Sequence, residues 1–429
     1  MIADITTANI SRRSFVAGAA AFPWVAKPSP TNAVTLRVSA TPSIFKKTFE
    51  TLSREFQRRH PGTVIELTAS ARDQEHQIQD TMRRALIGDL PDVSFEGLKY
   101  LRILERRRIA VPLDGLVGRQ AAWTADFGDS LIESARVGRS IVGLGAALSV
   151  PIIYYNASAV ASATGSNPLP QDWDQLLTLI AELGRTARPG MLGGFMQHAS
   201  TTWNYLAMVE SLGGSMMNAS ENRITFDDPP GRRALQIHAA FGRAGQARAD
   251  MDREQARQAF ASGAIALLVD SSSSLALLEK QIGGRFPLGT ARIPVAANGR
   301  IPVSGIAAVL MAREPSRQAV AWDFIKFVCG SVGQTIIGKS TGYFPANDGV
   351  MKRPEMLGSY YEARPLFRPV VASLPFASRW YAFPGNNSAK IDSVIIDGVG
   401  SVIRLSKTPD QALSAMRRAV QVLLPESRA

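Results

Sequence analysis

The segment VTLRVSATPSIFKKTFETLSREFQRRHPGTVIELTA, residues 34–69, decides the fold class of this chain. Residues 33–41 alternate apolar and polar side chains, which is typical of a strand. Four large apolar residues then recur at three- and four-residue steps and so share one helix face: Phe45, Phe49, Leu52 and Phe56. Pro61 and Gly62 end this helix, and residues 63–69 form a second strand. The segment therefore predicts a strand, a helix and a strand in succession.

The same alternation continues downstream. The spacing predicts a helix over residues 73–87, a short buried strand at 93–95 and another helix after residue 98. Alternating strands and helices predict an α/β lobe with a largely parallel sheet. Ligands of such sheets bind beyond the carboxyl ends of the strands, where Glu96 lies. Two interpretations of Glu96 stay open: its carboxylate accepts hydrogen bonds from ligand hydroxyls, or it favours the start of the next helix through the helix dipole.

Two later segments are informative, and the second brings further candidates for ligand contact. Trp203 is predicted in a helix that ends at Gly213 and Gly214. A run of four serines, residues 271–274, follows a predicted strand at 264–269 and precedes a helix. Hydroxyls and backbone N–H groups at such a turn are free to face a ligand. The alternative is that the run only over-supplies the helix cap, since one serine is enough for capping.

Length and composition indicate a globular protein of two domains or lobes. The chain has 429 residues, of which 45% are hydrophobic and 20% charged. The formal net charge of +12 would suit an anionic partner. The basic residues are scattered, however, and only residues 106–108 form a run of arginines. No platform of aromatic residues accompanies them, so we predict no nucleic-acid partner.

The N-terminal residues have the pattern of an export signal. The sequence SRRSFV at residues 11–16 precedes an uncharged apolar stretch at 17–26. That stretch, roughly ten residues, is shorter than the about twenty needed to span a bilayer. The arginine pair is typical of a bacterial twin-arginine signal, and cleavage after Ala33 is expected. We therefore predict that residues 1–33 are removed and that the protein is periplasmic; the alternative is a basic N-terminus of a folded domain.

Several catalytic and cofactor motifs are absent from the sequence. It has no GxxxxGK[ST], strand-linked GxGxxG, HExxH, CxxC or GxSxG pattern. The single cysteine, Cys329, lies in an apolar helical context, and the four histidines are not spaced as metal ligands. We therefore predict no cofactor, no metal site and no enzyme activity. A glycoside hydrolase with two carboxylates far apart in the sequence stays open as an alternative.

Several blocks, in order along the chain, resemble the family 1 extracellular solute-binding proteins of ABC importers. They are YYNASAVASATGSNPLPQDWDQLL, FASGAIALLVDSSSSLALLEK, GRFPLGTARIPV, the segment from SGIAAVLMAREP to STGYFPAN, and TPDQALSAMRRAVQVLL. The resemblance implies an α/β, two-lobed periplasmic-binding-protein fold whose ligand cleft lies between lobes joined by hinge strands. It implies lobe 1 at residues 34–147 and 303–346, and lobe 2 at 148–302 and 347–429. The nearest branch binds glycerol 3-phosphate and sugars.

The resemblance also implies a set of ligand contacts. The family's cleft positions fall on Glu96, Ser149, Trp203, Ser271 or Ser272, Gly305 and Tyr343. The tryptophan face would stack on a sugar ring or a glycerol backbone. The glycine would bring a backbone N–H to the ligand.

The sequence departs from the branch at two places. The loop SATPS lacks the aromatic residue usual in sugar binders. Phe383 or Pro384 occupies the place of the arginine that clamps phosphate, and Arg379 lies a few residues away. A buried phosphate without such an arginine would be poorly compensated. A neutral sugar or polyol is therefore an alternative to glycerol 3-phosphate, with Tyr381 and Asn386 as further contacts.

The sequence thus predicts a monomeric receptor that captures a carbohydrate, polyol or glycerol-3-phosphate-like solute and delivers it to ABC permease subunits at the inner membrane. Two alternatives remain: an exported hydrolase of glycans or phosphate esters, and a receptor that reports its ligand to a membrane sensor.

The export signal gives a direct prediction. Replacing Arg12 and Arg13 with lysine should keep the protein in the cytoplasm, because the twin-arginine route reads the arginine pair. Cell fractionation followed by immunoblotting measures this. Continued export of the variant would instead assign the signal to the general secretory route.

Overall fold

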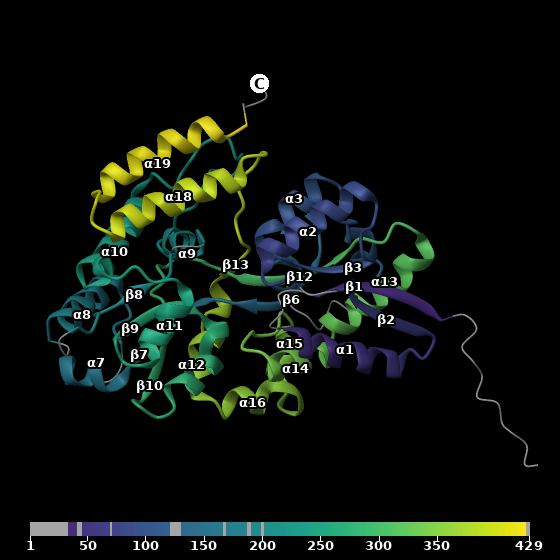
Figure 1. The fold of residues 1–429 in the computed structure, drawn as a ribbon, viewed down its shortest axis with the longest axis horizontal. Coiled ribbons are helices and arrows are strands. Elements are labelled where there is room, and N and C mark those ends of the chain that lie inside the picture. The colour runs from purple at the N-terminus through teal and green to yellow at the C-terminus, as the bar shows by residue number, and fades with distance from the viewer. Residues whose placement is uncertain are drawn as a thin grey trace, which may run out of the picture.

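The computed structural model describes residues 33–40, 45–68, 71–120, 130–165, 169–186, 190–198 and 201–425. The predicted export signal therefore lies almost entirely outside the described residues. Two separate sheets, each covered by helices, form two α/β lobes that lie side by side (Figure 1). We call them the first and the second lobe in the order in which the chain enters them.

The first lobe is built on a five-stranded sheet. Its order is β2 (Thr63–Thr68), β1 (Val34–Ser39), β3 (Val93–Gly97), β12 (Ser304–Leu310) and β6 (Leu144–Ser149). Strand β1 is parallel to β2 and β3, as predicted, whereas β12 is antiparallel to both β3 and β6. The predicted strand, helix and strand at residues 34–69 are confirmed.

Helices cover both faces of this sheet (Figure 1). On one side lie α1 (Lys46–Arg59), α13 (Pro315–Cys329) and α14 (Ser331–Ser340), and on the other α2 (Gln74–Ile87) and α3 (Leu101–Arg106). Phe49, Leu52 and Phe56 share one face of α1 because of their spacing, and this apolar face is buried against the sheet. Helix α2 begins where the Asp73 side chain accepts the His76 backbone N–H, and it ends at Gly88 in the left-handed conformation.

The second lobe contains a four-stranded sheet. Its order is β10 (Leu288–Arg292), β7 (Pro151–Asn156), β9 (Leu267–Ser271) and β8 (Phe195–Met196). Its helices are α7 (Ala157–Thr164), α8 (Trp173–Thr186), α9 (Trp203–Ser211), α10 (Pro229–Arg243), α11 (Arg253–Ala261) and α12 (Leu275–Ile282). The C-terminal helices α18 (Ser388–Ile403) and α19 (Pro409–Leu423) return to this lobe, where α18 packs on α10 (Figure 1).

Shorter elements complete the two lobes. They are α4 (Asp114–Gly118), α6 (Ser130–Glu133), β4 (Arg136–Val137), β5 (Ser140–Ile141), η4 (Ser272–Ser274), β11 (Ile301–Pro302), α15 (Asp348–Lys352), α16 (Ser359–Glu362), α17 (Arg368–Val371) and β13 (Ala377–Ser378). Within the described residues no single helix is long and apolar enough to cross a membrane; the pair α13 and α14 meets that test only together, with a 54° bend between them.

The chain passes between the sheets through short extended segments. Only Val150 separates β6 from β7, and only Val303 separates β11 from β12. A third segment joins them, since Leu148 and Phe344 form an isolated antiparallel bridge. Three stretches far apart in the sequence therefore lie side by side between the lobes, and this brings their polar side chains to one place.

Gly305, in the β12 part of this crossing, has no room for a side chain, so we predict that any substitution destabilises the fold. Its φ is +139°, and a Cβ there would lie 1.9 Å from the Ala147 carbonyl oxygen. We expect Gly305→Ala to lower the free energy of unfolding by about 2 kcal/mol or more, because of backbone strain and steric overlap. Urea denaturation measures it. Gly118→Ala, at an exposed helical glycine with open space around it, is the control, and equal stability of the two variants would contradict the prediction.

Candidate ligand-binding site

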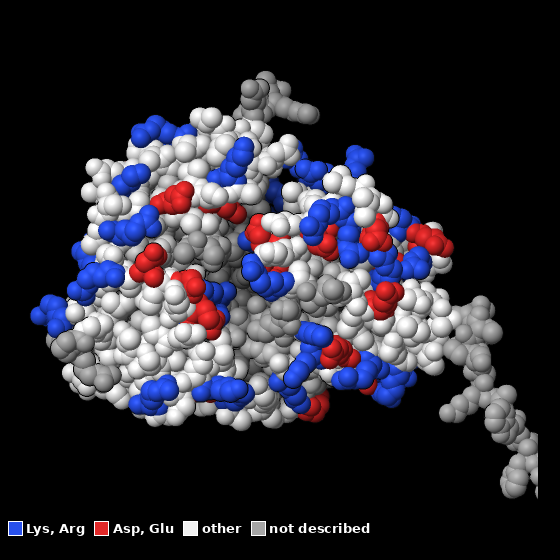
Figure 2. All heavy atoms as spheres, viewed as in Figure 1, with Lys and Arg blue, Asp and Glu red and all other residues white. Residues whose placement is uncertain are grey.

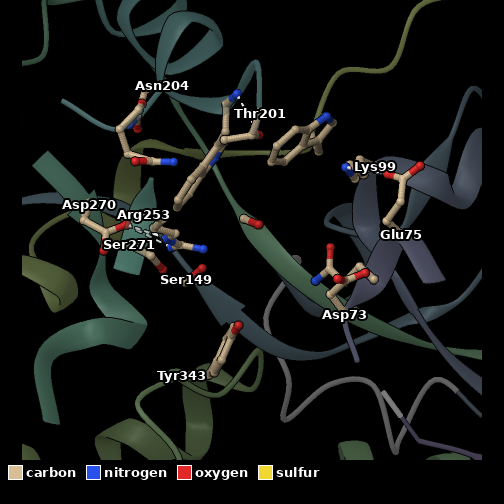
Figure 3. A pocket seen from close by; sticks show the side chains of 15 residues that line it. Asp73, Glu75, Lys99, Ser149, Thr201, Asn204, Arg253, Asp270, Ser271 and Tyr343 are labelled. Carbon is tan, nitrogen blue, oxygen red and sulfur yellow. Dashed lines mark hydrogen bonds and ion pairs between the residues drawn. The ribbon is translucent and has the colours of Figure 1, made fainter. Parts of the chain in front are cut away.

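A cavity of about 440 Å³ lies where the crossing segments meet. We call it the cleft cavity. Strand ends and helix starts from both lobes line it (Figure 3). Its lining residues are Asp73, Gln74, Glu75, Lys99, Ser149, Gln197, Thr201, Trp203, Asn204, Arg253, Asp270, Ser271, Ser304, Tyr343 and Trp380. Hydroxyls, amides, charged groups and two indole rings thus share one space.

The ring of Trp203 is fixed in position by the start of α9 and by a hydrogen bond. Its side chain is only 5% exposed, and its Nε1–H donates to the Pro302 carbonyl oxygen at 2.8 Å. The Trp380 ring lies nearly parallel to it, with ring centroids 6.1 Å apart and an interplanar angle of 18°. Because Pro302 belongs to a crossing segment, this bond ties the aromatic surface to the junction between the lobes. Such a surface can stack on the apolar face of a sugar ring or a glycerol backbone.

A buried carboxylate organises the second-lobe side of the cavity. Asp270, at the end of β9, accepts hydrogen bonds at Oδ1 from Arg253 Nε and Nη2, at 3.0 and 2.9 Å. Its Oδ2 accepts from Arg257 Nε at 2.7 Å and from the Ser274 hydroxyl at 2.9 Å. Burial alone would raise the pKa of Asp270, but the charges of Arg253 and Arg257 outweigh it and hold that pKa at about 2. Asp270 is therefore an ionised anchor for Arg253.

The start of α2 supplies acidic groups from the first lobe. Glu75 accepts a hydrogen bond from the Tyr100 hydroxyl at 2.6 Å, and Lys99 Nζ lies 3.8 Å from it. For Asp73, burial favours a higher pKa, but hydrogen bonds from His76 and Arg72 lower it to about 2. Both carboxylates and Lys99 lie across the cavity from Arg253 (Figure 3).

An ion pair connects the lobes outside the cleft cavity. Arg102 of α3 donates from Nη1 and Nη2 to the two carboxylate oxygens of Glu221, at 2.8 and 2.5 Å. Glu221 belongs to the second lobe, in the segment between α9 and α10. The Arg102 guanidinium also lies 5.9 Å from the centre of the Tyr381 ring.

Four of the predicted contacts come together in the cleft cavity: Ser149, Trp203, Ser271 and Tyr343. The remaining six do not line it: Glu96, Ser272, Gly305, Arg379, Tyr381 and Asn386. Tyr381 lies beside the Arg102 and Glu221 pair instead. Asn386 lines a neighbouring cavity of about 890 Å³ between the start of α18 and helices α2 and α3.

Glu96 corrects the expectation that a strand-end carboxylate faces the cleft. It is fully buried, and its Oε1 accepts hydrogen bonds from Ser94, Thr81 and Gln77, at 2.6, 2.6 and 3.3 Å. Burial raises its pKa, although these hydrogen bonds oppose the rise. The position along β3 is as predicted, but the side chain turns beneath α2. It hydrogen-bonds Gln77 and Thr81 of α2 and does not line the cavity.

Ser272 and Gly305 have structural roles in the crossing segments. The Ser272 hydroxyl accepts the Val150 backbone N–H at 3.1 Å, and its own N–H donates to the Val150 carbonyl at 2.8 Å. The carbonyl of Gly305 accepts a hydrogen bond from Gln74 Nε2 at 3.1 Å. Both residues hold the backbone next to the cavity, and their neighbours Ser271 and Ser304 line it.

Sequence reasoning missed the charged residues of the site. Arg253 and Asp270 are seventeen positions apart, so no local motif signals their pairing. Asp73 was detectable as a helix-capping residue, but nothing indicated that α2 starts at the cavity. Trp380 lies between two candidates that do not line the cavity, Arg379 and Tyr381.

Across the face of the molecule shown in Figure 2, basic and acidic side chains are interspersed, in agreement with the scattered charge seen in the sequence. Among the residues that the structure describes, no group of three His, Cys, Asp or Glu side chains gathers as a metal site would require.

Two α/β lobes around a polar, tryptophan-lined cavity define the class of two-lobed binding proteins. Residues 51–366 match the model of the family described as bacterial extracellular solute-binding protein. The chain belongs to this family, as the sequence predicted.

Solved structures share the fold. UgpB from Mycobacterium tuberculosis, in complex with glycerophosphocholine, has a TM-score of 0.78 at 21% identity, over 91% of this chain and 98% of that one. The sugar-binding protein MalE from Xanthomonas citri has a TM-score of 0.78 at 15% identity, over 91% and 97%. The cyclic alpha-maltosyl-1,6-maltose binding protein from Arthrobacter globiformis has a TM-score of 0.74 at 19% identity, over 91% of this chain and 98% of that one. The two-lobed periplasmic-binding-protein fold is thereby confirmed.

The surroundings of Arg379 yield a pH prediction. Arg379 is exposed and lies near Glu210, which accepts a hydrogen bond from the Ser378 hydroxyl at 2.5 Å. Burial raises the pKa of Glu210 from its ordinary 4.5 to about 7, although Ser378 and Arg379 oppose the rise. Between these two pH values the folded protein holds a proton that the unfolded chain has released, so this group lowers stability as pH rises from 4.5 through 7.

Glu210→Gln removes this loss of stability at high pH, since an amide does not ionise. We expect the variant to melt at a higher temperature than the unmodified protein at pH 8, with the difference shrinking towards pH 5. Thermal melts across this pH range measure it. Glu362→Gln, at an exposed position on α16, is the control and should show no such trend. A pH-independent difference for Glu210→Gln would contradict the prediction.

Proposed function

We propose that the protein is the periplasmic solute-binding component of an ABC importer, exported by a twin-arginine signal, and that it binds without catalysis. The observation that carries this proposal is the cleft cavity itself, where the fixed ring of Trp203 faces hydroxyls and amides contributed by both lobes. Membership of the solute-binding family supports binding over the hydrolase alternative. The protein acts as a monomer and delivers its solute to permease subunits at the inner membrane.

The ligand in this proposal is a carbohydrate, a polyol or a glycerol-3-phosphate-like solute. Ser149, Ser271, Ser304 and Tyr343 supply hydroxyls, and Asn204 supplies an amide, at separated points around the cavity. Such groups exchange hydrogen bonds with several ligand hydroxyls at once. The fold relatives point the same way, because their ligands are a glycerophosphodiester and maltose-type sugars.

Capture in this proposal follows from hinge closure. Lobe 1, residues 34–147 with 303–346, and lobe 2, residues 148–302 with 347–429, rotate about the crossing segments at Val150 and Val303. A ligand favours the closed state only if it contacts both lobes more fully there than in the open state. The permease reads the closed form. A receptor that signals to a membrane sensor would use the same closure, and transport assays in a deletion strain separate the two.

The proposal predicts a loss of binding on removal of the aromatic surface. In thermal-shift and calorimetric assays, members of a panel of sugars, polyols and glycerol phosphates should stabilise the protein. We expect Trp203→Ala to weaken binding of the best panel member by roughly tenfold or more, about 1.4 kcal/mol. Trp203→Phe keeps a ring face but loses the bond to Pro302, so it should retain most of the affinity. Unchanged affinity of a folded Trp203→Ala variant, or no response to the whole panel, would contradict the proposal.

A further inference from the structure

Two guanidinium groups, those of Arg253 and Arg257, share the Asp270 carboxylate. Arg257 has a second anionic partner in Glu254, whose Oε2 lies 3.4 Å from its Nη1. Arg257 is also the more enclosed of the two arginines, being 14% exposed and bound through Nη2 to the Ser274 hydroxyl at 2.6 Å. Arg257 and Glu254 do not line the cleft cavity, so the positive charge that this cluster turns to the cavity is that of Arg253.

Arg253 presents that charge to the cleft cavity. Its side chain lines the cavity and is 42% exposed. Its Nε and Nη2 both point at Asp270 Oδ1, which fixes the plane of the guanidinium. Among the described residues Nη1 has no hydrogen-bond partner, so the edge formed by Nη1 and Nη2 stays available. A guanidinium held along one edge offers the other as a two-pronged donor that matches the oxygens of a phosphate or a carboxylate.

Hydroxyl groups line the cavity together with Arg253. Ser149, Ser271 and Tyr343 line the same part of the cavity as Arg253 (Figure 3). The Ser271 hydroxyl is held by Ser273, whose hydroxyl lies 2.8 Å from it and whose backbone N–H donates to it at 3.2 Å. Hydroxyls beside a guanidinium complete the set of donors that an anionic group with two or three oxygens requires.

The opposite side of the cavity has the reverse character. Asp73 and Glu75 project from the start of α2; Arg72 Nε lies 3.2 Å from Asp73 outside the lining of the cavity, and Lys99 Nζ, in the lining, lies 3.8 Å from Glu75. Two carboxylates against one cation leave the lining of this side acidic. An anionic group would be repelled there, whereas ligand hydroxyls or a cationic group would find acceptors. The charges of the two lobes therefore dictate one orientation of the ligand.

We propose that the solute carries an anionic group, a phosphate or a carboxylate, which binds the free edge of Arg253 in the second lobe. Its hydroxylated or cationic remainder faces Asp73 and Glu75 of the first lobe and lies against Trp203. This inference rests on the proposed function and narrows its ligand class. It also supplies, from helix α11, the arginine that is missing at Phe383 and Pro384.

Calorimetry with matched probes tests the inference. The pairs are glycerol 3-phosphate against glycerol, glycerophosphocholine against glycerol, and galacturonate against galactose; the first and third pairs separate phosphate from carboxylate. We expect at least one anionic or zwitterionic probe to bind with a Kd at least about tenfold below that of its neutral counterpart, and its affinity to fall as salt is raised.

Two variants assign the effect to Arg253. Arg253→Gln should weaken the preferred anionic probe by about thirtyfold or more while changing the neutral probe by less than about threefold. Arg257→Gln is the matched control: it removes the other partner of Asp270 but no cavity-lining charge, and it should keep the preference for the anion. Arg253→Lys, which retains the charge but not the two-pronged edge, should give an intermediate affinity and covers the case in which Arg253→Gln does not fold.

The outcomes separate the two proposals. If neutral sugars bind the unmodified protein more tightly than every anionic probe, or if Arg253→Gln and Arg253→Lys leave the anionic preference intact, the anion site is overturned and the proposed function stands. If Arg257→Gln loses the preference as completely as Arg253→Gln does, the effect comes through Asp270 and the anion site is again overturned. If no probe of either kind binds the folded protein, the proposed function fails and the anion site fails with it.

Discussion

The junction at Val150 is the constraint on which the rest of the molecule depends. A single residue separates β6 of the first sheet from β7 of the second. The end of one sheet is therefore held next to the end of the other. The junction is held by reciprocal contacts with Ser272, whose backbone N–H donates to Val150 and whose hydroxyl accepts from it. As a result Ser149, at the end of one sheet, and Ser271, at the end of the other, line the same cavity. The course of the backbone thus brings residues of both lobes into one site.

The fold followed from sequence periodicity more directly than the site did. The apolar spacing of Phe49, Leu52 and Phe56 is a local property of α1, and burial of those side chains bears it out. Four site candidates, including Trp203 and Tyr343, came from the family resemblance and lie in one cavity. The antiparallel pairing of β12 with β3 and β6 had no local signal, since it joins residues more than 150 positions apart.

The misplaced candidates show what sequence alone could not supply. A strand-end rule places Glu96 along the chain but does not say to which face of the sheet its side chain turns, and here it turns towards Ser94 and Thr81. The same limit explains residues 379–381. Trp380 lines the cavity, while its neighbours Arg379 and Tyr381 do not. The direction of a side chain depends on tertiary packing, which pattern reading does not contain.

In the proposed hinge closure, the balance between open and closed states depends on interactions that the ligand makes. The Arg102 and Glu221 pair connects the lobes, but its side chains are 25% and 31% exposed, and such pairs contribute roughly 0 to 1 kcal/mol. That is too little to hold the lobes together, because a decisive population shift requires about 5.5 kcal/mol of preference for one state. In the proposed closure, the remainder comes from groups that meet through a bound solute. Arg253 and the carboxylates of Asp73 and Glu75 face each other across the cavity with opposite charge, so a solute that satisfies both sides links the two lobes.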